Sequence, residues 1–124
     1  MMKEEQLHKQ ICDYIKLRYP KVLFNTDMSG MKLTIGQAKK AKGLRSSNGF
    51  PDISIYHPVG MWYGLFLEVK KATPFKLNGE LRKNDHLEEQ YEMLLKLNSL
   101  GYFASFTWSF NHAKEIIDRY MKVK

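Results

Sequence analysis

Two short stretches of the sequence carry the residue types that could perform chemistry. Pro51-Asp52 opens one β-like segment, and Glu68-Val69-Lys70 closes the next one. Side chains alternate along a strand, so Glu68 and Lys70 share one face while Val69 takes the other. Two carboxylates and an ammonium group in one place can bind a divalent cation and act on a phosphodiester.

The spacing of these stretches predicts a hairpin that brings the two carboxylates together. Residues 51–57 and 63–70 have strand-like composition, and residues 58–62 supply a loop between them. This register places Asp52 opposite Glu68, where directly opposed Cβ atoms are roughly 4.5–5.5 Å apart. Two carboxylates this close repel, so one is protonated unless a cation joins them. The alternative is an ordinary hairpin on which Glu68 and Lys70 are solvated.

The segments around the hairpin predict a sheet with helices packed on it. Apolar residues recur at helical spacing over 4–19, over 86–100 and after Asn111, which we expect to cap the last helix. Further strands are predicted at 21–25 and 102–108. The stretch 29–49 is rich in glycine and lysine and forms a long connection with room for a short helix at 36–42. We therefore expect one domain over residues 1–124, of α/β or α+β class, with the order αβββαβα.

The composition fits a domain with a hydrophobic core and a basic surface. The 124 residues are 44% hydrophobic and carry a formal net charge of +7, which is compatible with a polyanionic partner such as nucleic acid. The one cysteine, Cys12, excludes a disulfide framework and fits a reducing compartment. No apolar stretch is long enough for a membrane span, and the N-terminus lacks a signal peptide, so we expect a soluble, cytoplasmic protein.

The histidines and the cysteine add nothing to this candidate site. The four histidines lack the spacing of metal ligands, and we interpret each as structural or as a surface residue. They are His8, His57, His86 and His112. Cys12 has no activating neighbour in the sequence, which predicts a packed, inert thiol.

The order and spacing of the motifs resemble a known nuclease superfamily. The segments 49–52 (GFPD) and 68–70 (EVK), in this element order, are similar to the PD-(D/E)xK nucleases. More narrowly, they resemble the small stand-alone VRR-type nuclease domains of phages and bacteria. Glu4 in the first helix and Gln90 in a later helix extend the resemblance over nearly the whole chain. The Val-Arg-Arg tripeptide that names the family is absent, and the basic segment 39–45 is a candidate replacement.

The resemblance implies a fold, an activity and a set of site residues. The fold would be a restriction-endonuclease-like α/β core, with a mixed central sheet flanked by helices. The activity would be DNA endonuclease cleavage that depends on Mg²⁺ or Mn²⁺ and needs no small-molecule cofactor. The implied metal ligands are Asp52, Glu68, the Val69 carbonyl and Glu4, with Glu5 as the alternative to Glu4. Lys70 would orient or help deprotonate the attacking water, and Gln90 would hold Lys70 or that water.

Basic residues provide candidate contacts to DNA phosphates, which would give binding without sequence preference. They are Lys32, Lys39, Lys40, Lys42, Arg45 and Lys71. A solvated, flexible loop is the alternative for this lysine-rich segment. The resemblance further implies cleavage of branched or junction DNA, or nicking, by a homodimer inside a bacterium or a phage-infected host. Two other functions remain open: an inactive nucleic-acid-binding module with the same fold, and a restriction-type enzyme that reads a short sequence.

Overall fold

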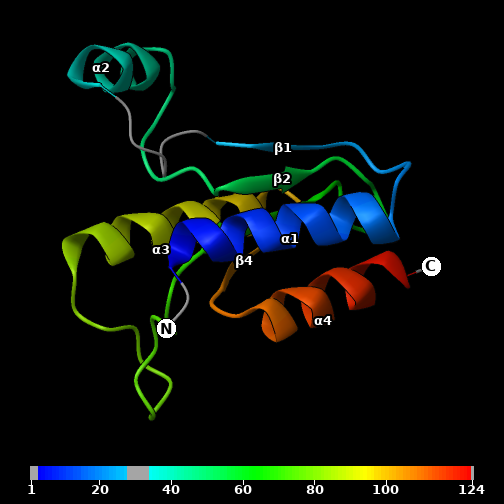
Figure 1. Cartoon of the computed structure of the whole chain (residues 1–124). Helices are drawn as coiled ribbons and strands as arrows, with labels where there is room; N and C mark the ends of the chain where they lie inside the picture. Colours follow the sequence, from blue (N-terminus) through cyan, green and yellow to red (C-terminus); the bar gives the residue numbers. More distant parts are fainter. Residues whose placement is uncertain (1–2, 28–33, 124) are drawn as a thin grey trace.

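The computed structural model describes residues 3–27 and 34–123, and it has the expected α/β architecture (Figure 1). The elements run in the order α1 (Glu4–Arg18), β1 (Phe24–Thr26), α2 (Ile35–Gly43), β2 (Ile53–Ile55), β3 (Leu65–Val69), α3 (Asp85–Ser99), β4 (Phe103–Thr107) and α4 (Phe110–Met121). Helix α2 lies in the long glycine- and lysine-rich connection, where the sequence left room for it. Among the described residues, no helix is long and apolar enough to cross a membrane.

The four strands form a mixed sheet in the order β1-β2-β3-β4. The first three strands are antiparallel neighbours, and β4 pairs with β3 in parallel. A parallel pair needs a crossover connection, which α3 supplies between β3 and β4. Ile53 pairs with Leu67 and Ile55 with Leu65, so the predicted hairpin register is confirmed. Continued by one residue, this register brings position 52 opposite position 68.

Helices cover both faces of the sheet, and the alternation along β3 separates two hydrophobic cores (Figure 1). Leu65, Leu67 and Val69 point into the core formed with α1 and α4. Phe66 points to the opposite face and packs with the buried residues of α3 and β4. This second core contains Met93, Leu94, Leu97, Ala104 and Phe106. Glu68 lies on the same face as Phe66, which directs its carboxyl group toward α3.

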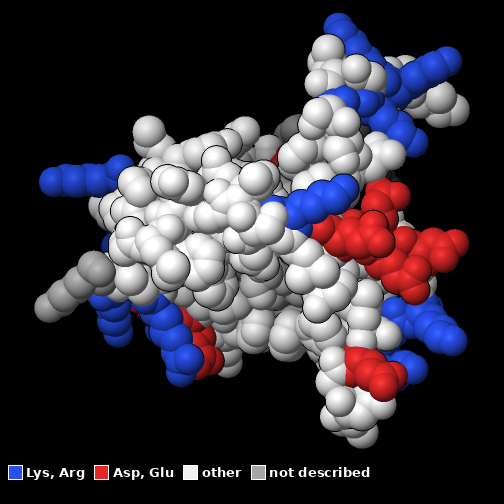
Figure 2. All heavy atoms as spheres, turned by 180° about the vertical axis from the view of Figure 1, so that it is seen from behind, with Lys and Arg blue, Asp and Glu red and all other residues white. Residues whose placement is uncertain are grey.

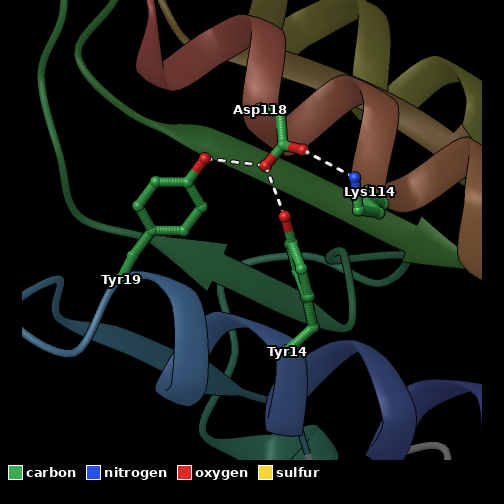
Figure 3. Close-up of polar contacts among 4 residues, drawn as sticks. All are labelled: Tyr14, Tyr19, Lys114 and Asp118. Carbon is green, nitrogen blue, oxygen red and sulfur yellow. Dashed lines mark hydrogen bonds and ion pairs between the residues drawn. The ribbon is translucent and has the colours of Figure 1, made fainter.

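A polar cluster around Asp118 joins the first helix to the last one (Figure 3). The hydroxyl groups of Tyr14 and Tyr19 donate to Asp118 Oδ1 at 2.6 and 2.7 Å, and Lys114 Nζ donates to Oδ2 at 3.2 Å. Burial acts to raise the pKa of Asp118, but these hydrogen bonds outweigh it and lower the pKa below its usual range. Burial, assisted by the hydrogen bond to Asp118, raises the pKa of Tyr14 and of Tyr19 to about 12.

Several predicted boundaries differ from the structure. The strands predicted at 21–25 and 51–57 are shorter, at Phe24–Thr26 and Ile53–Ile55, and the hairpin loop and the cap of the last helix also differ. The hairpin ladder ends at Ile55 and Leu65, so the connection is longer than the predicted loop 58–62. Tyr63 does not continue the ladder with β2, because its N–H donates instead to the carbonyl of Gly101, just before β4, at 2.8 Å. The helix α4 begins at Phe110, and Ser109, rather than Asn111, caps it by accepting the His112 N–H at 3.1 Å. Asn111 was therefore the wrong cap, since it lies inside the first turn.

Candidate active site

A cavity of about 1430 Å³ opens where α1 and the first turns of α3 meet β1, the start of β2 and the end of β3. One side of it is lined by α2 and the segment that follows this helix. Every residue that we assigned from the sequence to catalysis or metal binding lines this cavity: Glu4, Asp52, Glu68, Val69, Lys70 and Gln90. The fold therefore gathers residues from four separate parts of the chain into one place.

Asp52 and Glu68 form a pair of carboxyl groups where β2 begins and β3 ends, on the two central strands of the sheet. Asp52 Oδ2 accepts a hydrogen bond from the Val69 N–H at 2.8 Å, which fixes its carboxylate beside the end of β3. Glu68 is only 3% exposed. Burial, followed by the hydrogen bond to Asp52 and the charge of Asp52, raises the pKa of Glu68 far above its ordinary value, while Lys70 acts in the opposite direction. A proton or a cation must therefore neutralise this pair.

The donor atoms around this pair fit a hard divalent cation. The two carboxylates and the main-chain carbonyl of Val69 offer only oxygen, the ligand type of Mg²⁺ and Mn²⁺. Within residues 3–27 and 34–123, no group of three or more His, Cys, Asp or Glu side chains is arranged to hold a metal. The side-chain ligands would thus be two carboxylates, the number typical of Mg²⁺ sites that keep several waters.

Glu4 and Glu5 both lie in the first turn of α1, and both line the cavity. The charge of Glu4 reaches the carboxylate pair, since it contributes to the raised pKa of Glu68. Glu4 is an exposed residue, so its side chain can adapt to a ligand in the cavity. Of the alternatives left open by the sequence, the electrostatics therefore favour Glu4.

Lys70 is fixed by one hydrogen bond from its backbone and one from its ammonium group. Its backbone N–H donates to the Thr107 carbonyl at 2.8 Å, which attaches it to the end of β4. Its ammonium group donates to Gln90 Oε1 at 3.0 Å, and Gln90 is only 7% exposed. The amide nitrogen of Gln90 lies 3.2 Å from His86 Nε2. From the sequence, His86 is interpreted as a structural or surface residue. It precedes Gln90 by one helical turn, however, and this spacing makes the two residues neighbours.

The basic residues predicted to contact DNA fall into separate groups. Lys42 and Arg45 line the cavity. Lys39, Lys40 and Lys71 are exposed and do not belong to the described lining of the cavity. Lys32 lies outside the described residues. Arg45 is 24% exposed and forms an ion pair with Asp27 at 2.9 Å, which connects the segment after α2 to the end of β1. Its guanidinium is thus already engaged within the protein.

Helix α2 forms an arm that stands away from the body of the molecule (Figure 1). It has no buried residue. Figure 2 shows Lys and Arg side chains on this arm and a group of Asp and Glu side chains on the body beneath it. The first two turns of α3 supply exposed acidic residues on the body: Asp85, Glu88, Glu89 and Glu92. A polyanion would therefore meet attraction on the arm and repulsion along α3.

Two lysines that the sequence analysis did not select also line the cavity. Lys9 and Lys16 lie on α1, on the side that carries Glu5 and Cys12. Their helical spacing from Glu5 was the signal that could have identified them. Lys9 donates to Asp13 at 2.8 Å across one turn, so part of this basic surface is internally paired.

Comparisons with known proteins agree with the expected fold. No protein-family model matches the sequence, and no curated protein matches it either. A solved structure described as a VRR_NUC domain protein is similar, with a TM-score of 0.69 and 20% sequence identity. The similarity covers 99% of this chain and 91% of that chain. The chain thus has the fold of a VRR-NUC nuclease domain, as its sequence motifs predicted.

Proposed function

We propose, from the VRR-NUC fold of this chain, that it is a metal-dependent endonuclease that hydrolyses phosphodiester bonds in DNA. A fold alone does not fix an activity, so the proposal depends on the site. The observation that carries it is the buried Glu68 carboxyl group paired with the half-buried Asp52, with the charge of Lys70 acting on this pair. A buried pair of like charges costs stability in the absence of a ligand, and such pairs are typical of functional sites.

The proposed cofactor is Mg²⁺, with Mn²⁺ as the alternative. Asp52, Glu68 and the Val69 carbonyl would hold the ion, and Glu4 would complete its environment through a water. When bound, such an ion polarises a phosphate oxygen and lowers the pKa of a coordinated water. The Val69 N–H contributes by holding the Asp52 carboxylate in one orientation at 2.8 Å.

Lys70 has the proposed role of orienting the attacking water and stabilising negative charge on the phosphate. Its attachment to Thr107 through the backbone and to Gln90 through the ammonium group restricts where its charge lies. A positive group fixed before the reaction stabilises developing charge without reorganisation. Gln90 would therefore act by holding Lys70, one of the two roles inferred for it from the sequence.

DNA is the proposed substrate, bound through its phosphates. The lysines of the α2 arm and Lys71 would contact the backbone, while the acidic surface of α3 would keep DNA away from that side. Contacts of this kind carry no sequence information, which fits recognition of DNA structure. We further propose that branched or junction DNA is cleaved, or that single strands are nicked, and that two subunits combine when both strands are cut.

The test is cleavage of a matched panel of DNA substrates in Mg²⁺, in Mn²⁺ and in EDTA. The panel contains supercoiled plasmid, linear duplex, single strand, flap and four-way junction. Asp52→Ala and Lys70→Ala are the test variants, and Glu115→Ala and Lys114→Ala on α4 are the matched controls outside the cavity. The proposal predicts cleavage that needs the metal, is lost in both test variants and persists in both controls.

The other outcomes would each replace the proposal. Binding without cleavage under every metal would identify a catalytically inactive nucleic-acid-binding module. Cleavage that requires one short sequence would identify a restriction-type enzyme, because direct readout of base edges would then be needed. Cleavage that survives in Asp52→Ala would remove the carboxylate pair from the mechanism.

A further inference from the structure

The side-chain amide of Gln90 connects Lys70 to His86, and its orientation can be deduced. A lysine ammonium has only donors, so Gln90 must present its oxygen to Lys70, at 3.0 Å. The amide nitrogen then points to His86 Nε2, at 3.2 Å. An amide nitrogen can only donate, so His86 Nε2 must accept. This hydrogen-bond pattern requires a neutral imidazole with its proton on Nδ1.

The three residues form a short chain from the interior to the cavity. Gln90 is 7% exposed, so its amide depends on protein partners rather than on water. His86 is exposed and lines the cavity one helical turn before Gln90. Its backbone is also fixed, because Asn84 Oδ1 caps α3 by accepting the N–H groups of His86 and Leu87 at 2.9 and 3.1 Å.

We propose that His86 is a positioning residue whose Nε2 lone pair holds the Gln90 amide in the orientation that binds Lys70. The proposal rests on the function proposed above, in which Lys70 acts on the phosphate. A second proton on the imidazole would turn Nε2 into a donor facing a donor. The amide would then rotate, present its NH₂ group to the Lys70 ammonium, and release it. Protonation of His86 therefore uncouples Lys70 from α3.

The pH range in which this happens depends on the charges around the ring. The charged and titratable groups nearest to His86 in the cavity lining come from its own helix, the ends of the two central strands and the first turns of α1: Glu89, Asp52, Glu68, Lys70, Glu4, Glu5 and His8. Asp85 is its neighbour in the chain. An imidazole changes charge between about pH 5 and 8, the range in which a nuclease assay can follow it.

Three substitutions separate the roles of the imidazole. His86→Gln keeps an acceptor that does not titrate, His86→Lys offers only donors at every pH, and His86→Ala removes the partner. The measurement is kcat and KM for DNA cleavage in Mg²⁺ from about pH 5.5 to 8.5, across the imidazole range. His57→Gln is the control, since His57 lies outside the lining of this cavity among the described residues.

We expect His86→Ala to lower kcat about 3- to 10-fold at unchanged KM, the size expected for one lost hydrogen bond. His86→Lys should lose at least as much at the alkaline end. His86→Gln should stay within about twofold of wild type there and lack the fall in kcat that wild type shows at acidic pH. Identical pH profiles for wild type and His86→Gln would overturn the proposal.

A second readout separates this inference from the proposed activity. In the metal-free protein, ¹⁵N NMR should show His86 Nε2 as an unprotonated acceptor at the alkaline end, and the Gln90 side-chain amide signals should move as the imidazole titrates. These signals should not move with pH in His86→Ala. If wild type cleaves no substrate, the proposed function fails, yet a coupled titration still supports the His86–Gln90 link. A protonated Nε2 at alkaline pH overturns that link whatever the activity.

Discussion

Two carboxyl groups in this molecule, Asp118 and Glu68, occupy opposite electrostatic environments. Asp118 accepts hydrogen bonds from two tyrosine hydroxyl groups and one ammonium group (Figure 3). Glu68 is more deeply buried and lies against a second carboxylate, Asp52. The pKa of Asp118 is lowered, because its hydrogen bonds outweigh its burial, and the pKa of Glu68 is raised, first by burial and then by Asp52.

The difference shows that one fold can compensate the charge of one carboxyl group and leave that of another uncompensated. The charge of Asp118 is compensated inside the protein, so its contacts stabilise the packing of α1 on α4. The Asp52–Glu68 pair is not compensated by the chain alone, and it gains its missing positive charge from a proton or a cation. A carboxyl pair that costs stability until a cation joins it is the environment expected of the metal site that we propose.

The first prediction replaces one carboxyl group in each environment by its amide. Glu68→Gln should lower cleavage about 10²- to 10³-fold, the loss seen when one preorganised electrostatic group is removed. The unfolding free energy of the metal-free protein should stay unchanged or rise, because the raised pKa of Glu68 disfavours its charged form and glutamine is neutral at every pH. Asp118→Asn should instead lower the unfolding free energy by about 1–3 kcal/mol and leave cleavage within about twofold.

Urea unfolding without metal and cleavage of the preferred substrate measure both effects on the same protein samples. A Glu68→Gln variant as unstable as Asp118→Asn would show that Glu68 is an ordinary structural carboxyl group. An Asp118→Asn variant without activity at a temperature where it is folded would show that the two environments are coupled.

A second prediction concerns the cation itself. At a concentration a hundredfold above its Kd, Mg²⁺ should add about 2.7 kcal/mol to the unfolding free energy and raise Tm. Because the pKa of Glu68 is raised, the stability from its proton is complete below the unfolded pKa and is lost as the pH rises through the folded pKa. Mg²⁺ replaces that proton, so the rise in Tm should be larger at about pH 8 than at about pH 5.5. Thermal unfolding with Mg²⁺ and with EDTA at both pH values checks this.

The matched control for this experiment is Glu68→Gln, which lacks the displaced proton and one ligand. Its Tm should respond less to Mg²⁺, and the response should not grow with pH. An equal response in wild type and in Glu68→Gln would place the ion elsewhere on the protein.

The sequence was sufficient to predict the hairpin that carries the site. The alternation of apolar and polar residues in 51–57 and 63–70, with a turn between them, fixes the register that pairs Ile53 with Leu67. The contact between Lys70 and Gln90 could be anticipated only with the family resemblance, because it joins β3 to a helix 20 positions further along the chain.

Contacts set by tertiary packing were not predictable from local patterns. Asp118 meets Tyr14 across 104 positions of sequence, and nothing near either residue signals the pairing. Arg45 was predicted to contact DNA, but the fold places it against Asp27, which no local pattern indicates. His86 differs, since its spacing from Gln90 on a predicted helix was visible. The role that we propose for it follows only once the partner on the other side of Gln90 is known.

A third prediction concerns the pH dependence of the stability that Asp118 contributes. Its folded-state pKa is lowered, so its contribution is complete above the unfolded pKa and is lost as the pH falls through the folded pKa. Between about pH 5 and 3, wild type should thus lose more unfolding free energy than Asp118→Asn. The difference between the two losses should be roughly 1 kcal/mol. Urea unfolding at both pH values measures this. Tyr14→Phe removes one donor and should give a smaller change of the same sign.

Asp13→Asn is the control for the acid range, because the ion pair of Asp13 with Lys9 is exposed and helical surface pairs contribute little. A change in acid stability as large as that of Asp118→Asn would mean that net charge, rather than the tyrosine cluster, sets the acid sensitivity.

The last prediction compares how a lysine of the α2 arm and a lysine elsewhere on the surface contribute to DNA binding. Lys39→Ala, on α2, should weaken DNA binding a few-fold and reduce the slope of log K against log salt by about 0.9, the value for one phosphate contact. Lys114→Ala removes an equal charge from α4, where the ammonium lies 3.2 Å from Asp118 and outside the cavity. Its slope should match that of wild type. Fluorescence anisotropy in EDTA at several salt concentrations measures both variants. Equal slopes for the two would mean that DNA responds to the net charge of +7 alone, whereas a change confined to Lys39→Ala would mean that the α2 arm contacts the DNA phosphates.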